Sequence, residues 1–440
     1  FLFIRSSIAR AGSNRARILA EINAQGSARI SRRWNLISDV DVGHNAETTG
    51  TAVDLDLFGD VSLIKLICTA QTQEGISTLT SWLTESHAES DIVDRRRLAR
   101  ELAGALEWRQ RCELICRGIR RQSRSARFFR DWTSGKEVQE NSFLLNVYSQ
   151  IVLYLMPLSL IVFVAFPSGL TFAPIMLLIL ANFLIMVAFS GNIHTFVKEL
   201  TVHPDMPGLS SLGRVFSHIA LAPLSEQIPA RRCAKDAERA LGRLRNILYL
   251  ATLAQRPALA IFVYFPLQLI FSWDLLMVRL LTNWKQSFGG NWDAWFGAIG
   301  YIEAVNSLAS VEFEHPGWCA PEFSPCQSGT AVCIIATGMG HPLLPDAECV
   351  LNDLEIGPSG SLVLLTGSNM SGKSTLLRAV GLNVTLALAG ANCCCHSFRL
   401  PLLRIATSIR LADSIGRGTS LFLAEVLRLR EIVSAMNDSN

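Results

Sequence analysis

The stretch that decides the fold is SLVLLTGSNMSGKST, residues 361–375. Its first part, Ser361–Thr366, is a short apolar run of the kind that forms a buried parallel strand. Its second part has two glycines separated by four residues and then Lys373 and Ser374, the G-x-x-x-x-G-K-S pattern of a phosphate-binding loop. The following run, Thr375–Ala389, is compatible with a helix. The stretch therefore predicts a strand, a phosphate-binding loop and a helix.

Each part of this loop has a physical role in binding a nucleotide. Glycines permit a tight turn and let backbone N–H groups come close to a phosphate, and the following helix points its positive end at the anion. Lys373 can reach the outer phosphates, and Ser374 can hold Mg²⁺. The nucleotide-binding residues that we predict are Gly367, Ser368, Asn369, Met370, Ser371, Gly372, Lys373, Ser374 and Thr375, with Ser374 as the magnesium ligand.

The loop also resembles that of a known family. Residues Thr366–Thr375 fit T-G-x-N-M-x-G-K-S-T, the form of this loop in the MutS family of DNA mismatch-repair ATPases, and the Asn-Met pair is more specific than the glycine spacing. Three other stretches are similar to parts of the family. Gly340–Pro342 with Leu351–Asp353 resembles its adenine-pocket segment, and Asp413–Glu425 resembles its signature loop and the following helix. Asp54–Gly59, with the helices to about residue 120, resembles its helical core and lever. The resemblance covers residues 45–140 and 200–440.

This resemblance implies an ATPase whose two subunits rearrange when ATP binds, so we expect ATP, Mg²⁺ and a second copy of the chain as partners. Lys373 and Ser374 would hold the triphosphate and the metal, and Asn352 would lie near the base. Ser420, with Gly418 and Thr419, would approach the γ-phosphate held by the partner subunit. DNA is a further potential partner. Mismatch recognition is in doubt, because no mismatch-reading domain with a Phe-x-Glu wedge precedes the core.

The family's second motif, an apolar strand that ends in Asp-Glu, does not occur in this sequence. No catalytic carboxylate is therefore identified, and hydrolysis is expected only of a longer protein. The start at Phe1 and the end at Asn440 also suggest a partial sequence. Two alternatives stay open. A transporter ATPase is disfavoured by the small number of predicted spans and by the lack of Leu-Ser-Gly-Gly at Gly416–Ser420, and the other alternative is a scaffold that binds nucleotide without hydrolysing it.

A second strong pattern is the absence of charge from Asn141 to Val197, a run of 57 residues. Pro167-Ser168-Gly169 divides its centre into two arms, Tyr148–Phe166 and Leu170–Phe189. Each arm has about 20 residues, or roughly 30 Å of helix, the thickness of a hydrocarbon core. The run therefore predicts a transmembrane helical hairpin in a lipid bilayer, although a pair of buried core helices is the alternative. The hairpin lies between the two stretches that resemble the MutS family, residues 45–140 and 200–440. Membrane-associated MutS-like proteins carry an insertion at this place.

A basic cluster precedes the hairpin and predicts its orientation. By the positive-inside rule, the cluster places both flanks of the hairpin and the ATPase domain on the cytoplasmic side. Lipid headgroups are favoured over DNA as its partner because the hairpin is adjacent. The cluster consists of Arg117, Arg120, Arg121, Arg124, Arg127, Arg130 and Lys136.

Composition and these patterns together give the predicted organisation. Half of the 440 residues are hydrophobic and 18% are charged, below the roughly 25% of soluble domains. The net charge of +3 gives no general signal for nucleic acid, and eleven cysteines are too few for a disulfide scaffold. We predict a multidomain chain: an Arg-rich segment (1–45), a helical core and lever in two parts (46–140 and 198–325), the transmembrane hairpin (141–197), and an incomplete α/β P-loop domain of the ABC type (326–440).

Weaker signals have structural readings that we favour. The Arg-rich start is either an organellar transit peptide or a solvated helix or tail. Pro257–Trp273 is apolar but short, so a buried core helix is favoured over a third membrane segment. Cys393–His396, and the pair Cys112 and Cys116, are more typical of a core than of a metal site, while His315 and His341 precede prolines and fit turns better than catalysis.

Overall fold

The structure is a computed structural model that describes residues 2–43, 50–120, 132–133, 142–202, 206–253, 260–324, 334–358, 360–368, 371–409 and 421–437. The chain divides into two compact units. The first comprises residues 1–117, 222–228 and 299–440, and the second comprises residues 118–221 and 229–298. Asn369, Met370, most of the basic cluster and the signature loop with Gly418, Thr419 and Ser420 lie outside the described residues.

The first unit is mainly helical, and hydroxyl side chains start two of its helices. Ser62 accepts a hydrogen bond from the Lys65 N–H, and Thr72 accepts one from the Gly75 N–H. Such caps satisfy N–H groups that the first helical turn cannot pair. The helices are α1 (Leu2–Ile30), α2 (Gly50–Asp54), α3 (Leu63–Ile67), α4 (Gln73–Thr84), α5 (Glu89–Ala103), α6 (Leu106–Arg120), α15 (Trp292–Glu314), α16 (Lys373–Ala389) and α17 (Leu421–Asn437).

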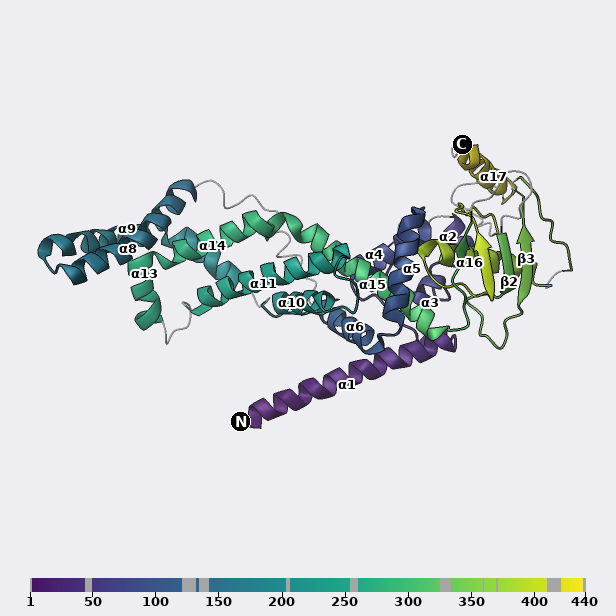
Figure 1. Cartoon of the computed structure of the whole chain (residues 1–440), viewed down its shortest axis with the longest axis horizontal. Helices are drawn as coiled ribbons and strands as arrows, with labels where there is room; N and C mark the ends of the chain where they lie inside the picture. Colours follow the sequence, from purple (N-terminus) through teal and green to yellow (C-terminus); the bar gives the residue numbers. More distant parts are fainter. Residues whose placement is uncertain are drawn as a thin grey trace. The chain divides into compact units, whose positions relative to one another are not determined.

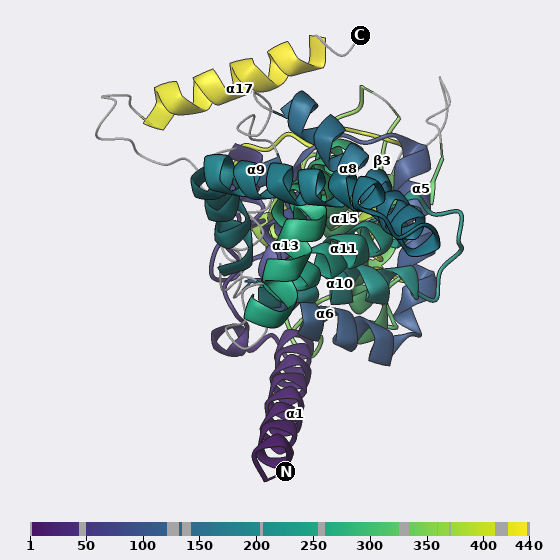
Figure 2. The same cartoon turned by 90° about the vertical axis from the view of Figure 1, so that its left-hand side faces the viewer.

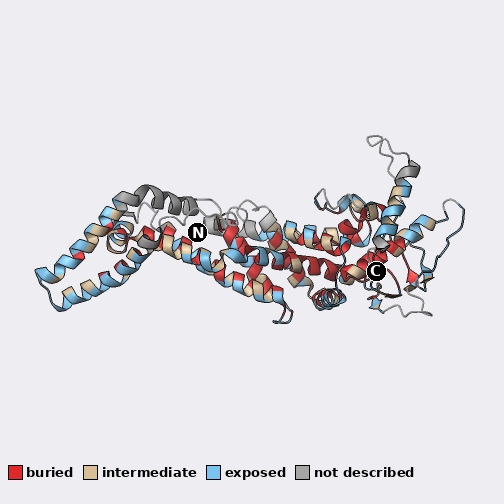
Figure 3. Cartoon of the chain, turned by 90° about the horizontal axis from the view of Figure 1, so that it is seen from above, coloured by how far each residue is buried: buried red, intermediate tan, exposed pale blue. Residues whose placement is uncertain are grey.

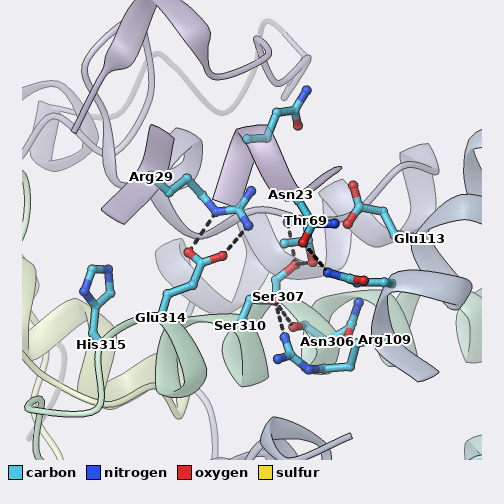
Figure 4. Close-up of polar contacts among 12 residues, drawn as sticks. Asn23, Arg29, Thr69, Arg109, Glu113, Asn306, Ser307, Ser310, Glu314 and His315 are labelled. Atoms are coloured by element: carbon cyan, nitrogen blue, oxygen red, sulfur yellow. Dashed lines mark hydrogen bonds and ion pairs between the residues drawn. The ribbon is translucent and has the colours of Figure 1, made fainter. Parts of the chain in front are cut away.

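Polar side chains join α15 to the helices around it, as Figure 4 shows. Ser307 accepts a hydrogen bond from the Thr69 N–H (3.0 Å), and Arg109 donates to the Ser310 hydroxyl (2.8 Å). These residues are buried. A buried polar group destabilises the fold unless it has a partner, so these bonds specify how α15 packs against its neighbours.

Most described side chains of α1 are exposed, as expected of the solvated helix that we predicted, but the end of the Arg-rich segment is part of this core. Arg29 lies at the end of α1 and forms a buried ion pair with Glu314 of α15 (Figure 4). Arg32 donates to the Pro342 carbonyl at 3.0 Å and is also buried. A count of arginines does not distinguish solvated side chains from paired ones, because guanidinium groups are buried only where a partner exists elsewhere in the chain.

The first unit also contains a mixed four-stranded sheet in the order β1-β4-β2-β3. Its strands are β1 (Glu322–Phe323), β2 (Ile334–Met339), β3 (Asn352–Ile356) and β4 (Ser397–Leu400). β1 pairs parallel to β4, whereas β2 pairs antiparallel to both β3 and β4. Figure 1 shows α16 beside this sheet. The predicted helix after the phosphate-binding loop is therefore present, and it is α16.

The predicted buried strand Ser361–Thr366 is not a strand, and this prediction was wrong. The segment is exposed, with Leu362 at 89% and Leu364 at 78% exposure. None of the described strands pairs with it. Because a strand requires a neighbour to pair its N–H and C=O groups and to cover its side chains, an apolar run without one does not enter the sheet.

The second unit contains the charge-free run as two antiparallel helices, α8 (Ser142–Ala165) and α9 (Gly169–Val202). Ser168 and Thr171 start α9 by exchanging hydrogen bonds between their backbone N–H groups and hydroxyls (3.1 and 3.3 Å). Most of the described apolar side chains along both arms are exposed (Figure 3). The alternative of two buried core helices is therefore not what the structure has.

Length and composition distinguish the two arms. Among the described residues, one helix, Val147–Ala165, is long and apolar enough to cross a membrane. The apolar part of α9, Gly169–Ile185, is shorter. Phe262–Phe271 and the helical run that starts at Trp273 are separated by a bend. They are long and apolar enough to cross a membrane only if the two helices are counted together as one span.

The rest of the second unit consists of helices. Figures 1 and 2 both show α13 beside α8 and α9. We predicted a buried core helix for Pro257–Trp273; in its described part, from Ala260, Phe262 and Phe265 are 81% and 47% exposed, so this part is not a buried core helix. The elements are α10 (Met206–Ala220), α11 (Pro229–Leu253), a π-helix (Ala260–Tyr264), α13 (Phe265–Phe271), α14 (Trp273–Phe288) and the first part of α15.

Candidate nucleotide-binding site

The phosphate-binding loop lies directly before α16 and closes around a lysine. Gly372 has φ +86°, a left-handed conformation that favours glycine, and it starts the helix. The ammonium group of Lys373 donates to the carbonyls of Gly367 (2.7 Å) and Ser368 (2.6 Å). A side chain at Gly367 would lie 2.8 Å from the Ser371 hydroxyl, so Ser371 would have to change its rotamer to admit one.

The start of α16 offers a set of hydrogen-bond donors. Its first intrahelical bond runs from the Leu376 N–H to the Gly372 carbonyl at 2.9 Å. The N–H groups of Lys373, Ser374 and Thr375 therefore have no acceptor within the helix. Ser374 and Thr375 are exposed. Three N–H groups, two hydroxyls and an ammonium group at a positive helix end fit the oxygens of a phosphate and, through Ser374, a magnesium ion.

A buried asparagine fixes the position of α16. Asn383 is fully buried; its amide donates to the Gly340 carbonyl (2.9 Å) and its oxygen accepts from the Cys394 N–H (2.7 Å). The Gly340 N–H in turn donates to the Cys394 carbonyl (2.8 Å). Cys393, Cys394 and Cys395 are buried in the turn before β4. Through Cys394, this cysteine run helps to hold α16 in place.

The Asp54–Gly59 turn contacts the same helix. Arg378 of α16 donates to the Asp54 carbonyl (3.0 Å) and lies 3.5 Å from the Asp56 carboxylate. A side chain on Gly381 would lie 2.5 Å from the buried Leu55, so the helix and the turn are in close contact. Sequence reasoning missed Arg378, because one arginine in a helix gives no indication of its partner more than 300 residues earlier in the chain.

Asn352 stands at the start of β3, with its side chain exposed. Its amide donates to the Val350 carbonyl at 3.1 Å. Among the described residues, no hydrogen bond joins it to residues 367–375. Its neighbour Asp353 accepts from the Gly338 N–H at 2.7 Å and thereby holds β3 to the end of β2. A role for Asn352 near the base stays a prediction.

The two histidines singled out in the sequence are packed and hydrogen-bonded. His315 stacks on Trp318, with ring centroids 4.3 Å apart, and its Nε2 lies 3.3 Å from the Arg32 guanidinium. Burial and the nearby arginine charges lower the pKa of His315 to about 3. His341 accepts a hydrogen bond from the Leu343 N–H (3.3 Å), and burial lowers its pKa as well. Both rings are therefore neutral near pH 7.

The cysteines examined as metal ligands lie in the core. Cys112 and Cys116 of α6 are buried, and the hydrogen bond with the Cys112 thiol, together with burial, raises the pKa of Cys116. Within the described part of the chain, no three His, Cys, Asp or Glu side chains are grouped so that they could hold a metal ion. Arg117, the one member of the basic cluster whose side chain is described, is paired with Glu113 (2.9 Å) and Glu21 (3.5 Å).

Comparison with known proteins locates a family in the C-terminal part. MutS domain V matches residues 363–440. The chain is similar to the DNA mismatch repair protein MSH6 of Arabidopsis thaliana, with 36% identity over 144 residues, which is 31% of this chain and 11% of that protein. It is also similar to a probable mismatch repair protein Msh6 of Drosophila melanogaster (35% over 160 residues; 35% and 13%) and to MutS of Chlorobium phaeobacteroides (34% over 147 residues; 32% and 16%).

These matches confirm the resemblance to the MutS family for about a third of the chain. They span 11–16% of the length of these three relatives. The phosphate-binding loop and α16 lie inside the segment that matches domain V. The similarity to MutS domain V therefore applies to the phosphate-binding loop and α16, whereas Asn352 and the Asp54–Gly59 turn lie before the matched segment.

Proposed function

We propose that the chain is the nucleotide-binding part of a MutS-like ATPase, that it acts as a homodimer, and that α8 and α9 anchor it in a membrane. One observation carries the nucleotide part of the proposal. The start of α16 combines a lysine, two hydroxyls and three N–H groups without helical acceptors, and it lies in a segment that matches MutS domain V.

The proposed roles follow from the chemistry of each group. Bound Mg-ATP would supply a triphosphate whose hydrolysis can drive a rearrangement of the dimer. Lys373 donates to two loop carbonyls in this structure, and its ammonium group would hold the outer phosphates instead. Ser374 would ligate Mg²⁺, and Asn352 would lie near the base. Gly418, Thr419 and Ser420 would reach the nucleotide of the second subunit.

The contact between α16 and the Asp54–Gly59 turn supports a route from the nucleotide to the helical core. Arg378 is on the second turn of the helix that starts at Lys373, and it contacts Asp54 and Asp56. A shift of α16 on nucleotide binding would move these contacts directly. DNA binding is a further part of the proposal and rests on the similarity to mismatch repair proteins.

Photoaffinity labelling tests the nucleotide part. The detergent-solubilised protein is irradiated with 8-azido-ATP and Mg²⁺, digested and mapped by mass spectrometry. We expect the label to fall between residues 334 and 409 and to be suppressed by excess Mg-ATP. Labelling confined to residues 118–298, or labelling that Mg-ATP does not suppress, would contradict the proposal.

The membrane part rests on the exposed apolar surface of the hairpin. α8 has 24 residues and carries no charged side chain. Its length is about 36 Å, which is sufficient to cross a hydrocarbon core. Leu170 at the tip is 88% exposed, and Val164 and Phe166 are more than 70% exposed. In water these side chains would leave a large apolar surface without cover. By the positive-inside rule, the basic residues before α8 support a cytoplasmic position for both flanks as part of this proposal.

Flotation tests this anchor. The protein is reconstituted with phosphatidylcholine vesicles and centrifuged in a density gradient, beside a variant that lacks residues 146–190. We expect the wild type to float with the vesicles and the variant to remain at the bottom while still taking the 8-azido-ATP label. A wild-type protein that stays at the bottom without detergent would overturn the anchor but not the nucleotide site.

A further inference from the structure

The helical run after the hairpin is broken between α13 and α14, and the residue at the break is buried. α13 ends at Ser272, where the backbone is left-handed (φ +50°, ψ +56°), and the chain bends by 75° before α14. A left-handed conformation is unfavourable for a residue with a Cβ. Ser272 is 1% exposed. The end of a helix also leaves carbonyl groups without helical donors, and these groups need partners from elsewhere.

A side chain from the hairpin satisfies these carbonyl groups. Asn182, in the middle of α9, is 1% exposed, and its amide donates to the carbonyls of Leu269 (2.6 Å) and Ile270 (3.1 Å). Its own oxygen accepts from the hydroxyls of Tyr148 and Ser272, each at 2.6 Å. The asparagine thus uses both of its donors and both lone pairs, and it joins α8, α9 and the end of α13.

A second group at the same break is also satisfied internally. The Tyr264 hydroxyl donates to the Asp274 carboxylate at 2.7 Å, and the Asp274 N–H donates to the Gln268 side chain at 3.0 Å. Gln268 and Asp274 are buried. These polar groups at the bend therefore face one another, whereas the neighbouring Trp273 indole N–H is buried without a hydrogen-bond partner among the described residues.

The outer surface of the same segment is apolar. Phe262 is 81% exposed, Phe265 is 47% exposed and Val263 is 39% exposed. No charged residue occurs from Pro257 to Trp273. α13 packs against both α8 and α9, so its exposed Phe265 lies on a helix that contacts the apolar hairpin.

In hydrocarbon every backbone polar group must be paired within the protein, and broken helices occur there only when side chains cover the freed groups. We propose that Ala260–Phe271 enters the bilayer beside the hairpin as a re-entrant segment whose C-terminal end is capped by Asn182. The π-helix and α13 have five and seven residues, so together they reach about 18 Å and cannot cross a 30 Å core. This inference rests on the proposed insertion of α8 and α9.

Site-specific photo-crosslinking tests the proposal and separates it from the anchor. A benzoylphenylalanine replaces Leu170, Phe262 or Leu221 in the full chain in phosphatidylcholine vesicles, and adducts are identified by mass spectrometry. Leu221 is a matched control, because it is 75% exposed but belongs to neither the hairpin nor α13. We expect phospholipid adducts at positions 170 and 262 and none at 221.

Each other outcome decides a specific point. Lipid adducts at position 170 without any at 262 would overturn the re-entrant segment and leave the anchor intact. Adducts at 262 to a second copy of the chain would overturn it too. Absence of lipid at 170 would overturn the anchor and, with it, this inference.

A variant tests the capping role of Asn182. Asn182→Leu removes both donors to the end of α13, so we expect the yield of lipid adducts at position 262 to fall several-fold while the yield at 170 is unchanged. Ser159→Ala is the control, because Ser159 is a hairpin hydroxyl whose hydrogen bond among the described residues stays within α8, to the Met156 carbonyl. Equal adduct yields at 262 in both variants would contradict capping by Asn182.

Discussion

Glu303 is a residue that the sequence gives no reason to select, yet it supports the start of α4. Its carboxylate is buried and accepts hydrogen bonds from the backbone N–H groups of Gln71 (2.9 Å) and Thr72 (3.2 Å) and from the Thr72 hydroxyl. Burial raises the pKa of this carboxyl group, and the hydrogen bonds oppose that rise. The residue therefore acts on the fold through its hydrogen bonds.

Removing this carboxylate has a predictable effect on stability. Glu303→Ala leaves two buried N–H groups without an acceptor, so we expect the free energy of unfolding to fall by about 2–5 kcal/mol. Urea unfolding followed by circular dichroism measures it. Glu101→Ala is the control, because Glu101 is exposed and has only a distant partner, Arg97 at 4.0 Å; its effect should stay below about 0.5 kcal/mol. Similar losses in the two variants would contradict the role of Glu303.

His315 gives a prediction about pH. Its folded pKa of about 3 lies below the ordinary value of 6.5, so below pH 6.5 the unfolded chain binds a proton that the folded chain does not. The stability contributed by neutral His315 is present above pH 6.5 and is lost as the pH falls toward 3, by about 1.4 kcal/mol per pH unit.

His315→Phe keeps a ring on Trp318 and removes the titration. We expect the difference in unfolding free energy between wild type and variant to change with this slope between pH 6.5 and 4.5. Taking the difference removes the carboxylates common to both, including Glu113 and Glu303, whose pKa values are raised by burial. A difference that is constant with pH would contradict a buried neutral histidine.

At the scale of elements, two helices approach so closely that only glycine fits between them. A side chain on Gly300 of α15 would lie 2.7 Å from the Glu74 carbonyl of α4, which is backbone and cannot move aside. Gly297 is on the same helix, and nothing lies within 4 Å of a side chain added there. The pair separates the effect of packing from that of helix propensity.

Alanine at these two positions should act in opposite directions. We expect Gly300→Ala to lower the free energy of unfolding by about 1–3 kcal/mol through overpacking. Gly297→Ala should raise it by up to about 1 kcal/mol, because alanine favours helix over glycine. Urea unfolding of both variants measures the two changes, and changes of the same sign would show that α4 and α15 do not pack this closely.

Some elements could be predicted from local sequence patterns. The structure of others depends on contacts with residues far away in the chain. α16 and the two arms of the hairpin follow from residue type and run length, which are local properties. The predicted strand Ser361–Thr366 was wrong because a strand depends on neighbouring strands that a local run does not reveal. The exposure of Phe262 and the burial of Arg29 were missed for the same reason, since each depends on helices far away in the sequence.

The candidate site shows the same division. The spacing alone predicted the loop residues from Gly367 to Thr375 as nucleotide ligands; the described ones lie just before α16 or in its first turn, and their role as ligands stays a prediction. Asn383 and Arg378, which hold α16 to the cysteine turn and to the Asp54–Gly59 turn, carry no sequence signal. A sequence motif indicates which ligand a loop can bind. The residues that hold the loop and its helix in place are set by contacts with distant parts of the chain, which the motif does not show.

At the scale of the whole molecule, the account combines a MutS-type nucleotide site in one unit with an apolar hairpin in the other. The membrane and the nucleotide are separate claims, and the experiments above address them separately. The nucleotide claim is central, because the function that we propose depends on a triphosphate bound at the start of α16.

Isothermal titration calorimetry tests this claim most directly. It compares Mg-ATP binding to the detergent-solubilised wild type and to the Lys373→Ala variant. Lys373→Ala removes a charge-assisted contact worth roughly 1.5–3 kcal/mol, so the account predicts a Kd raised about 10- to 100-fold. Lys235→Ala on α11 removes the same charge from the other unit and should leave the Kd unchanged. Equal Mg-ATP affinity in wild type and Lys373→Ala would contradict the account.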